Sequence, residues 1–256
     1  MFRLCDRDRT FLNAAHLADV LANSIFVFDR KGDLKHPLFT FTRLNGGSYG
    51  TVFRARLAVD RIRRCEGVVS AADTSLTFIV KLTVFGDPTV NEVGMLQRAM
   101  MHCGTVFTRD GRNITISPRR APFFASAFCT QSFRRDGNNL RPTSDATGAT
   151  HSITFCEDLN MLDARPFCQV LDEEVRGSRP VDEVYSLIID VWFGVVAQLA
   201  AMRRVFSPTF SHNDLHTENV FVRRVPVRIS WAGGTRERTL SAESYLIDFG
   251  LATAGG

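Results

Sequence analysis

The stretch Phe210-Ser-His-Asn-Asp-Leu-His-Thr-Glu-Asn-Val-Phe-Val222 decides how this sequence is interpreted, together with Asp248-Phe-Gly250 further along the chain. The first stretch carries a carboxylate at Asp214 and an amide at Asn219, directly before an apolar run. The second stretch places a carboxylate directly after the apolar run Tyr245-Leu-Ile247. Carboxylate and amide oxygens are ligands that Mg²⁺ accepts in proteins. The spacing therefore indicates a site built from loops that border two short strands.

These residue types meet the requirements of phosphoryl transfer. That reaction uses one carboxylate to orient the attacking hydroxyl, and an amide with a second carboxylate to hold magnesium against the phosphates. Asp214 is therefore the candidate catalytic base, and Asn219 and Asp248 are the candidate metal ligands. Each motif alone is short enough to occur by chance, but their order and their apolar flanks make the pair specific.

The two motifs resemble the catalytic loop and the Asp-Phe-Gly motif of the protein kinase superfamily. The resemblance implies that His212 supports the loop backbone. It places His216 where Ser/Thr kinases carry a lysine that contacts the transferred phosphate, and Asn213 where many carry an arginine that reads a phosphorylated activation loop. The Asp-Leu-His version is similar to divergent kinases, including haspin-type kinases and those of large DNA viruses, and also to small-molecule phosphotransferases.

A glycine-rich segment, Asn45-Gly-Gly-Ser-Tyr-Gly-Thr-Val52, separates two stretches with strand-like alternation. Glycines allow backbone N–H groups to approach phosphates closely. The segment resembles the kinase glycine-rich loop, with Asn45 where the first glycine usually stands. The resemblance implies an ATP-binding role for Leu44, Asn45, Gly46, Gly47, Ser48, Tyr49, Gly50, Thr51 and Val52.

Lys81 is one of only three lysines among 31 basic residues, and it follows the apolar run Phe78-Ile-Val80. A lysine at such a position can extend its ammonium group to solvent along an apolar strand. The kinase resemblance implies instead that Lys81 contacts the α- and β-phosphates of ATP and pairs with a helix glutamate. Glu92 is the candidate for that glutamate.

Composition limits the other function classes. The chain has 256 residues, 45% of them apolar and 23% charged, with a net charge of +4. Its arginine pairs are scattered, which argues against nucleic-acid binding. Six cysteines lack metal-binding spacing, and the charged N-terminus lacks an apolar signal core, which predicts an intracellular protein of the cytoplasm or nucleus, or of a host cell if viral. The apolar run Leu187–Met202 is interpreted as a buried helix rather than a membrane span.

Periodicity predicts the secondary structure. Helices are expected over 13–23, 90–103 and 181–205. Strands are expected over 39–44, 51–57, 76–82, 113–117, 152–156 and 245–247. The polar segment 134–150 is expected to be an exposed or disordered loop, and the glycines at 232–235 predict a hairpin.

The resemblance implies an α+β, two-lobed protein-kinase-like fold with a β-rich small lobe and a helical, truncated large lobe. Residues 1–38 would form an N-terminal extension with a short helix, 39–160 the small lobe and hinge, and 161–256 a partial large lobe. The sequence ends six residues after Gly250. This end predicts a protein partner that covers the missing large-lobe helices.

Three functions remain open at this point. The first is a protein kinase that uses ATP and Mg²⁺ to phosphorylate a Ser or Thr hydroxyl of a protein substrate. The second is a small-molecule phosphotransferase, and the third is a pseudokinase or interaction module that binds nucleotide without transfer. Neither nucleic acid nor a membrane is expected as a partner.

Overall fold

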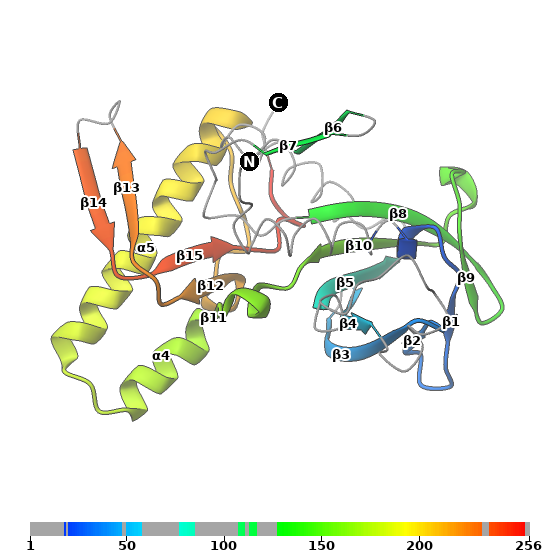
Figure 1. Cartoon of the computed structure of the whole chain (residues 1–256), viewed down its shortest axis with the longest axis horizontal. Coiled ribbons are helices and arrows are strands. Elements are labelled where there is room, and N and C mark those ends of the chain that lie inside the picture. Colours follow the sequence, from blue (N-terminus) through cyan, green and yellow to red (C-terminus); the bar gives the residue numbers. More distant parts are fainter. Residues whose placement is uncertain are drawn as a thin grey trace. The chain divides into compact units, whose positions relative to one another are not determined.

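The computed structural model describes residue 18 and residues 20–47, 50–57, 77–84, 107–110, 113–116, 127–231 and 236–253 (Figure 1). The chain divides into two compact units. Unit 1 comprises Met1–Val93 and Ser126–Met161, and unit 2 comprises Gly94–Ala125 and Leu162–Gly256.

Unit 1 is built on an eight-stranded antiparallel sheet with the strand order β2-β1-β9-β8-β10-β5-β4-β3 (Figure 1). The strands are β1 (Phe26–Phe28), β2 (Leu34–Lys35), β3 (Phe39–Gly47), β4 (Gly50–Leu57), β5 (Thr77–Val84), β8 (Ala127–Asp136), β9 (Asn139–Pro142) and β10 (His151–Glu157). The edge strands β2 and β3 are consecutive in the sequence and are joined by a short connection. The sheet therefore curls into a nearly closed, barrel-like form.

The core of unit 1 lies on one face of this curled sheet and is rich in phenylalanine. Alternate residues of β4 are buried, namely Phe53, Ala55 and Leu57, as period-2 patterning requires of a strand with one apolar face. Phe26 of β1 packs edge-on against Phe41 of β3, with ring centroids 5.9 Å apart. This contact joins strands from opposite ends of the sheet order, which shows that the two ends close around a shared core.

Unit 2 contains two α-helices within its described residues, α4 (Phe167–Arg176) and α5 (Val181–Val205), and several short strands (Figure 1). Strands β11 (Arg165–Pro166), β12 (Val220–Arg223) and β15 (Glu243–Leu246) form one sheet in that order. Strands β13 (Val227–Trp231) and β14 (Arg236–Leu240) form a hairpin, as do β6 (Phe107–Asp110) and β7 (Asn113–Ile116). Among the described residues of the whole chain, the 3₁₀ helices are η3 (Ala146–Gly148), η4 (Leu159–Leu162) and η5 (Thr217–Asn219), of which η5 lies in unit 2.

Helix α5 buries one stripe of its surface against unit 2. Leu187, Val191 and Val195 are at most 2% exposed, at the i, i+4, i+8 spacing that places residues on one helix face. The opposite side carries apolar residues that are more than half exposed, among them Tyr185 and Val196. Among the described residues, Val181–Ala200 is the one helical segment long and apolar enough to cross a membrane, and a third of that window is buried. Core helices pass the same test, so the segment is weak evidence for a membrane span.

The expected fold class is wrong. The structure is mostly β, with 41% strand and 29% helix, and its dominant feature is the barrel-like sheet rather than a two-lobed kinase fold with a helical large lobe. In the described residues from 127 onward, α4 and α5 are the α-helices, whereas the chain after α5 pairs into strands. The reason lies in short β-branched or alternating runs such as Val220–Arg223 and Val227–Trp231, which satisfy their backbone groups by pairing.

Several predictions of individual helices and strands are confirmed. The helix over 181–205 is confirmed with the bounds of α5, and the strands expected around 39–44, 51–57, 76–82, 113–117, 152–156 and 245–247 correspond to β3, β4, β5, β7, β10 and β15. The loop expected over 134–150 is wrong, because Asn139–Pro142 forms strand β9 between β1 and β8. Residues 18 and 20–22 are helical, as expected, whereas the helix expected over 90–103 lies outside the described residues.

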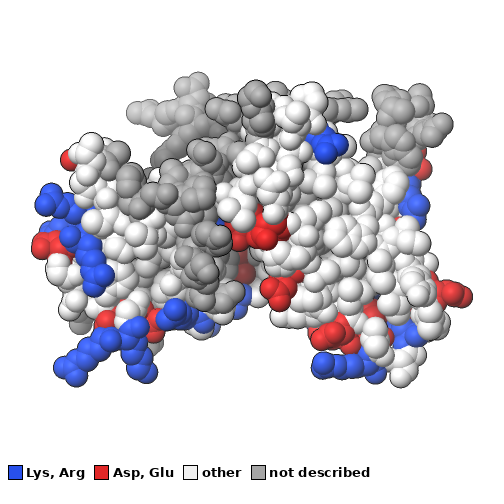
Figure 2. All heavy atoms as spheres, turned by 180° about the vertical axis from the view of Figure 1, so that it is seen from behind, with Lys and Arg blue, Asp and Glu red and all other residues white. Residues whose placement is uncertain are grey.

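Charged side chains of both signs occur in small groups on the face shown in Figure 2. Among the described residues, charged side chains form ion pairs that are at least partly exposed, such as Lys35 with Asp29 at 3.2 Å and Arg141 with Asp136 at 3.7 Å. Exposed pairs of this kind contribute little to stability.

Candidate functional site

The loops that carry Asp214 and Asp248 lie side by side in unit 2. Strands β12 and β15 pair with Val220 opposite Leu246, so the residues just outside this pair are also neighbours. The N–H of Ile247 donates to the backbone oxygen of Asn219 at 3.1 Å and extends the ladder by one bond. Strand pairing therefore brings Asn219, at the end of one loop, next to the start of the loop that carries Asp248.

Asp214 is held by the amide of Asn219. The Asn219 Nδ2 donates to the backbone oxygen of Asp214 at 2.8 Å and to its carboxylate Oδ2 at 3.1 Å. Asn219 is 7% exposed, whereas the Asp214 side chain is 40% exposed. The Nε2 of His216 lies 3.8 Å from the other carboxylate oxygen of Asp214. The arrangement presents an accessible carboxylate whose orientation is fixed by a buried amide.

The buried side chain of His212 connects the loop that carries Asp214 to the loop that carries Asp248. It is 3% exposed, its Nε2 donates to the backbone oxygen of Ile247 at 3.0 Å, and its ring lies 4.9 Å from that of Phe249. Burial lowers the pKa of this imidazole below its usual value, although the bond to Ile247 and the carboxylates of Asp248 and Asp214 act in the opposite direction. A neutral ring with its proton on Nε2 matches this geometry. His212 thereby fixes the residue that precedes Asp248.

Asn219 and Asp248 suit a magnesium ion that also takes ligands from a substrate. The nitrogen of the Asn219 amide points to Asp214, which leaves its Oδ1 as the ligand atom. Asp248 has φ 58°, a left-handed conformation that is uncommon for a residue other than glycine and often marks a functional loop. Among the described residues, there is no group of three or more His, Cys, Asp or Glu side chains that could hold a metal. Mg²⁺ is commonly bound by one or two protein oxygens together with phosphates and water, which is the ligand set that this pair could support.

In unit 1 the structure brings the glycine-rich segment and Lys81 together on one sheet. The segment is the tip of the β3–β4 hairpin, with Gly46 opposite Thr51 and Gly47 opposite Gly50. Lys81 pairs with Val52 on β4 and with Thr154 on β10, so it stands between two neighbouring strands. The predicted ATP-binding residues of the hairpin are therefore direct neighbours of the predicted phosphate-binding lysine.

Position 50 requires a glycine, both for its backbone conformation and for the space around it. Its φ is +144°, and a Cβ atom at this position would lie 2.3 Å from the backbone oxygen of Leu82. That separation is shorter than real Cβ contacts, so a side chain would push β4 and β5 apart. The backbones of Asn45, Gly46 and Gly47 are described as part of β3, whereas Ser48, Tyr49 and Glu92 lie outside the described residues.

The predicted residues thus form two groups. Leu44–Val52 and Lys81 belong to unit 1, and Asp214, His216, Asn219 and Asp248 belong to unit 2. Within each unit the predicted residues are close in space.

A buried polar contact behind the Asp248 loop was missed from the sequence. Gln198 of α5 donates to Ser244 Oγ at 3.0 Å and to the Ser244 backbone oxygen at 3.1 Å, and it accepts from the Leu246 N–H at 3.0 Å. Gly194 permits this approach, since a Cβ there would lie 2.4 Å from Ser244 Oγ. Gln198 thereby fixes β15 two residues before Asp248. The available signal was a glutamine within the otherwise apolar stretch 191–202 of α5.

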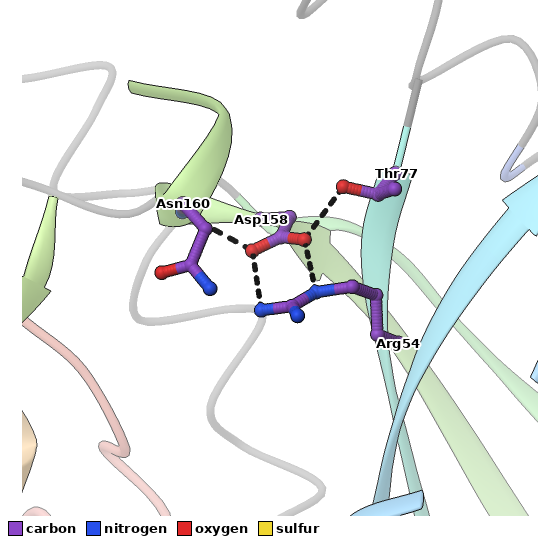
Figure 3. Close-up of polar contacts among 4 residues, drawn as sticks. All are labelled: Arg54, Thr77, Asp158 and Asn160. Atoms are coloured by element: carbon purple, nitrogen blue, oxygen red, sulfur yellow. Dashed lines mark hydrogen bonds and ion pairs between the residues drawn. The ribbon is translucent and has the colours of Figure 1, made fainter. Parts of the chain in front are cut away.

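A second polar cluster, in unit 1, was also missed (Figure 3). The carboxylate of Asp158 accepts from Arg54 Nε at 2.6 Å, from Thr77 Oγ1 at 2.6 Å and from the Asn160 N–H at 3.1 Å. Asp158 is 3% exposed, so its charge is compensated by these donors rather than by water. The cluster joins β4 and β5 to the segment that follows β10. The signal in the sequence was a pair of consecutive acidic residues, Glu157 and Asp158, at the end of a strand.

Comparison of the chain with models of known protein families found no match. Comparison with curated proteins found no match either. The residues of the site and their geometry are therefore the basis for inferring a function.

Proposed function

We propose that the chain is an ATP-dependent protein kinase that transfers the γ-phosphate to a Ser or Thr hydroxyl. The observation that carries the proposal is the bonded arrangement of Asp214, Asn219 and Ile247, which holds an accessible carboxylate beside the Asp248 loop. The proposal depends on these loops and not on a kinase-like fold. Phosphoryl transfer is achieved mainly by positioning and electrostatics, so a small set of fixed oxygens is the feature that matters most.

Asp214 is the group proposed to orient the acceptor hydroxyl and take its proton. The acceptor oxygen forms a bond to the γ-phosphorus, the bond from that phosphorus to the bridging oxygen of ATP breaks, and ADP leaves. The proton of the hydroxyl passes to the Asp214 carboxylate. Support for this role comes from the exposure of the carboxylate and from the Asn219 amide that fixes its direction.

Asn219 and Asp248 would hold magnesium, and Lys81 with the Leu44–Val52 hairpin would bind the nucleotide. When bound, magnesium would neutralise charge on the phosphates. The protein contributes the fixed oxygens, which are oriented by the Ile247 bond and by His212. His216, close to Asp214, is a candidate contact for the transferred phosphate.

The test is transfer of label from γ-labelled ATP with Mg²⁺ to two acceptor pools, generic proteins and small alcohols or sugars. We expect label on protein Ser or Thr, and a loss of about 10²-fold or more in kcat for Asp214→Asn, the scale of general acid–base groups. Asp163→Asn is the matched control, because Asp163 is exposed and belongs to the same unit. Label on small acceptors alone would indicate a small-molecule phosphotransferase. Nucleotide binding without any transfer would indicate an interaction module, and an Asp214→Asn protein as fast as the parent would refute the mechanism.

A further inference from the structure

The segment after Asp248-Phe-Gly250 is attached to the start of the Asp214 loop. Ser211 and Thr253 form an antiparallel bridge, in which the Ser211 N–H donates to Thr253 O at 3.0 Å and the Thr253 N–H donates to Ser211 O at 2.9 Å. The side chain of Asn213 adds two bonds, from Nδ2 to Leu251 O at 2.9 Å and to Thr253 Oγ1 at 3.0 Å. Four hydrogen bonds therefore hold Leu251–Thr253 against Ser211–Asn213.

The backbone of Asn213 is strained in a way that suits this task. Its φ is 62°, in the left-handed region, where asparagine is tolerated better than most residues because its short polar side chain can bond locally. The side chain of Asn213 is exposed, so burial in a packed core does not explain the residue type. Its two side-chain hydrogen bonds run to residues 38 and 40 positions away in the sequence. The side chain therefore serves a long-range contact rather than a local turn.

Two consecutive residues thus hold the Asp248 loop at both of its ends. His212 bonds to Ile247, directly before Asp248, and Asn213 bonds to Leu251, directly after Gly250. The next residue in the chain is Asp214 itself. The separation between the proposed base and the proposed metal ligand is consequently set by these two side chains as well as by the β12–β15 pair.

We propose that Asn213 is a positioning residue that fixes the far end of the Asp248 loop through its amide. This inference rests on the proposed phosphotransfer function for its kinetic consequence, whereas the contact itself can be tested without activity. Both bonds join neutral groups, so the attachment needs neither a charged partner nor a modified side chain. Removing the amide should loosen Leu251–Thr253 and weaken the hold on Asp248, which raises the Mg²⁺ concentration that turnover requires.

The test uses three variants in the full chain. Asn213→Gly keeps access to positive φ and removes both bonds, because glycine adopts this region readily. Thr253→Val removes the hydroxyl that accepts from Asn213, with little change in side-chain shape, whereas Thr253→Ser keeps a hydroxyl at this position. Thr209→Val is the control, since Thr209 is exposed in the same unit and its hydroxyl bonds only locally to Ser207.

Two readouts separate the inference from the proposed function. The first is amide hydrogen exchange at Ser211 and Thr253, which should become about 3- to 10-fold faster in Asn213→Gly, the factor expected from the loss of one or two neutral hydrogen bonds. Thr253→Val should show a smaller increase, and Thr253→Ser and Thr209→Val should match the parent. The second is the Mg²⁺ concentration at half-maximal turnover. It should rise most in Asn213→Gly, less in Thr253→Val, and not at all in Thr253→Ser and Thr209→Val.

Each outcome is decisive. Faster exchange together with a raised Mg²⁺ requirement supports the positioning role. Parent-like exchange in both Asn213→Gly and Thr253→Val overturns the attachment. Faster exchange with an unchanged Mg²⁺ requirement overturns the positioning role and leaves a merely structural contact. A parent protein that transfers no phosphate refutes the proposed function, while the exchange measurement still decides whether Asn213 holds the segment.

Discussion

The aromatic core of unit 1 and the contact between α5 and β15 in unit 2 are held together by different forces. In unit 1, Phe53, Phe78 and Phe155 are completely buried in one apolar cluster that spans the curled sheet. In unit 2, β15 is fixed to α5 by buried polar groups, with Gln198 and Ser244 each 1% exposed and directly bonded. One region is therefore defined by shape and apolar area, and the other by a small number of directed bonds.

This difference predicts how a substitution in each region affects the residues of the candidate site. Apolar burial is non-directional and roughly proportional to area, so the strands that carry the hairpin and Lys81 depend on the apolar area that this cluster keeps buried. Buried hydrogen bonds are directional, and a donor or acceptor that loses its partner pays the full cost of desolvation. The proposed magnesium ligand Asp248 lies two residues beyond β15, so its position depends on the second kind of contact.

The largest effect is expected from a cavity in unit 1. Phe53→Ala should lower the free energy of unfolding by about 3–5 kcal/mol, the usual cost of removing a buried aromatic ring. Urea unfolding and hydrogen exchange of the β4 and β5 amides would measure it. Val84→Ala, at a side chain 65% exposed on β5, should cost little. Equal costs for the two substitutions would show that the aromatic cluster does not hold the sheet.

A smaller but more localised effect is expected from Gln198→Met. The methionine has nearly the same shape but leaves the Leu246 N–H and the Ser244 oxygen without their partners, at roughly 1–3 kcal/mol for each buried group. Exchange of the Leu246 amide should accelerate, while the strands of unit 1 should be unaffected. Gln169→Met, on an exposed position of α4, is the matched control. Unchanged exchange at Leu246 would mean that β15 is held by its pairing with β12 alone.

The smallest effect concerns acid. Burial lowers the pKa of His36 to about 4, and its Nδ1 accepts from the Leu38 N–H at 3.2 Å, which requires an unprotonated nitrogen. As the pH falls below about 6.5, His36 takes up a proton in the unfolded chain but not yet in the folded chain. The contribution of this group to the free energy of unfolding should therefore be fully present above about pH 6.5 and be lost between about pH 6.5 and 4. The loss should be about 1 kcal/mol after screening by solvent.

The variant His36→Asn tests the origin of that acid sensitivity. Its side-chain oxygen can accept the same N–H and does not titrate, so urea unfolding at pH 7 and pH 4.5 should differ less than in the parent. Burial also lowers the pKa of His151 and His212, so some acid sensitivity should remain. An identical pH dependence in the variant and the parent would exclude His36 as a contributor.

The sequence predicted local elements because their signals are local. The α5 bounds follow from helical periodicity between Pro180 and Phe206, and the glycine at position 50 is required by its own backbone. The burial of α5 was predicted less well, since the run Leu187–Met202 was interpreted as a buried helix, whereas Ile189 is 55% and Val196 is 62% exposed. Helix α5 carries apolar side chains on both its buried and its exposed sides, so periodicity alone does not identify its contact face. Gly194 and Gln198 mark that face, and both lie against Ser244, about 50 residues further along the chain.

Long-range pairing explains what the sequence could not predict. Strand β9 lies in a polar segment that resembles a loop, and it becomes a strand because Leu140 pairs with Phe26 and with Arg135 on neighbouring strands. The nearly closed sheet follows from such pairings, which no short motif encodes. The components of the candidate site were found because they depend on short motifs, whereas Gln198 and Asp158, which fix their surroundings, carry no motif of their own.

The central claim is that Asn219 and Asp248 hold the magnesium of a phosphotransfer site. Asp248→Asn tests it most directly, with Asp163→Asn as a closely matched control, because both aspartates have nearly the same backbone conformation, φ 58° and 57°. The measurement is the Mg²⁺ dependence of label transfer from ATP by the parent and the two variants. We predict that Asp248→Asn raises the Mg²⁺ concentration at half-maximal turnover by at least about tenfold, and that Asp163→Asn leaves it unchanged. The same Mg²⁺ dependence in all three proteins would contradict the claim.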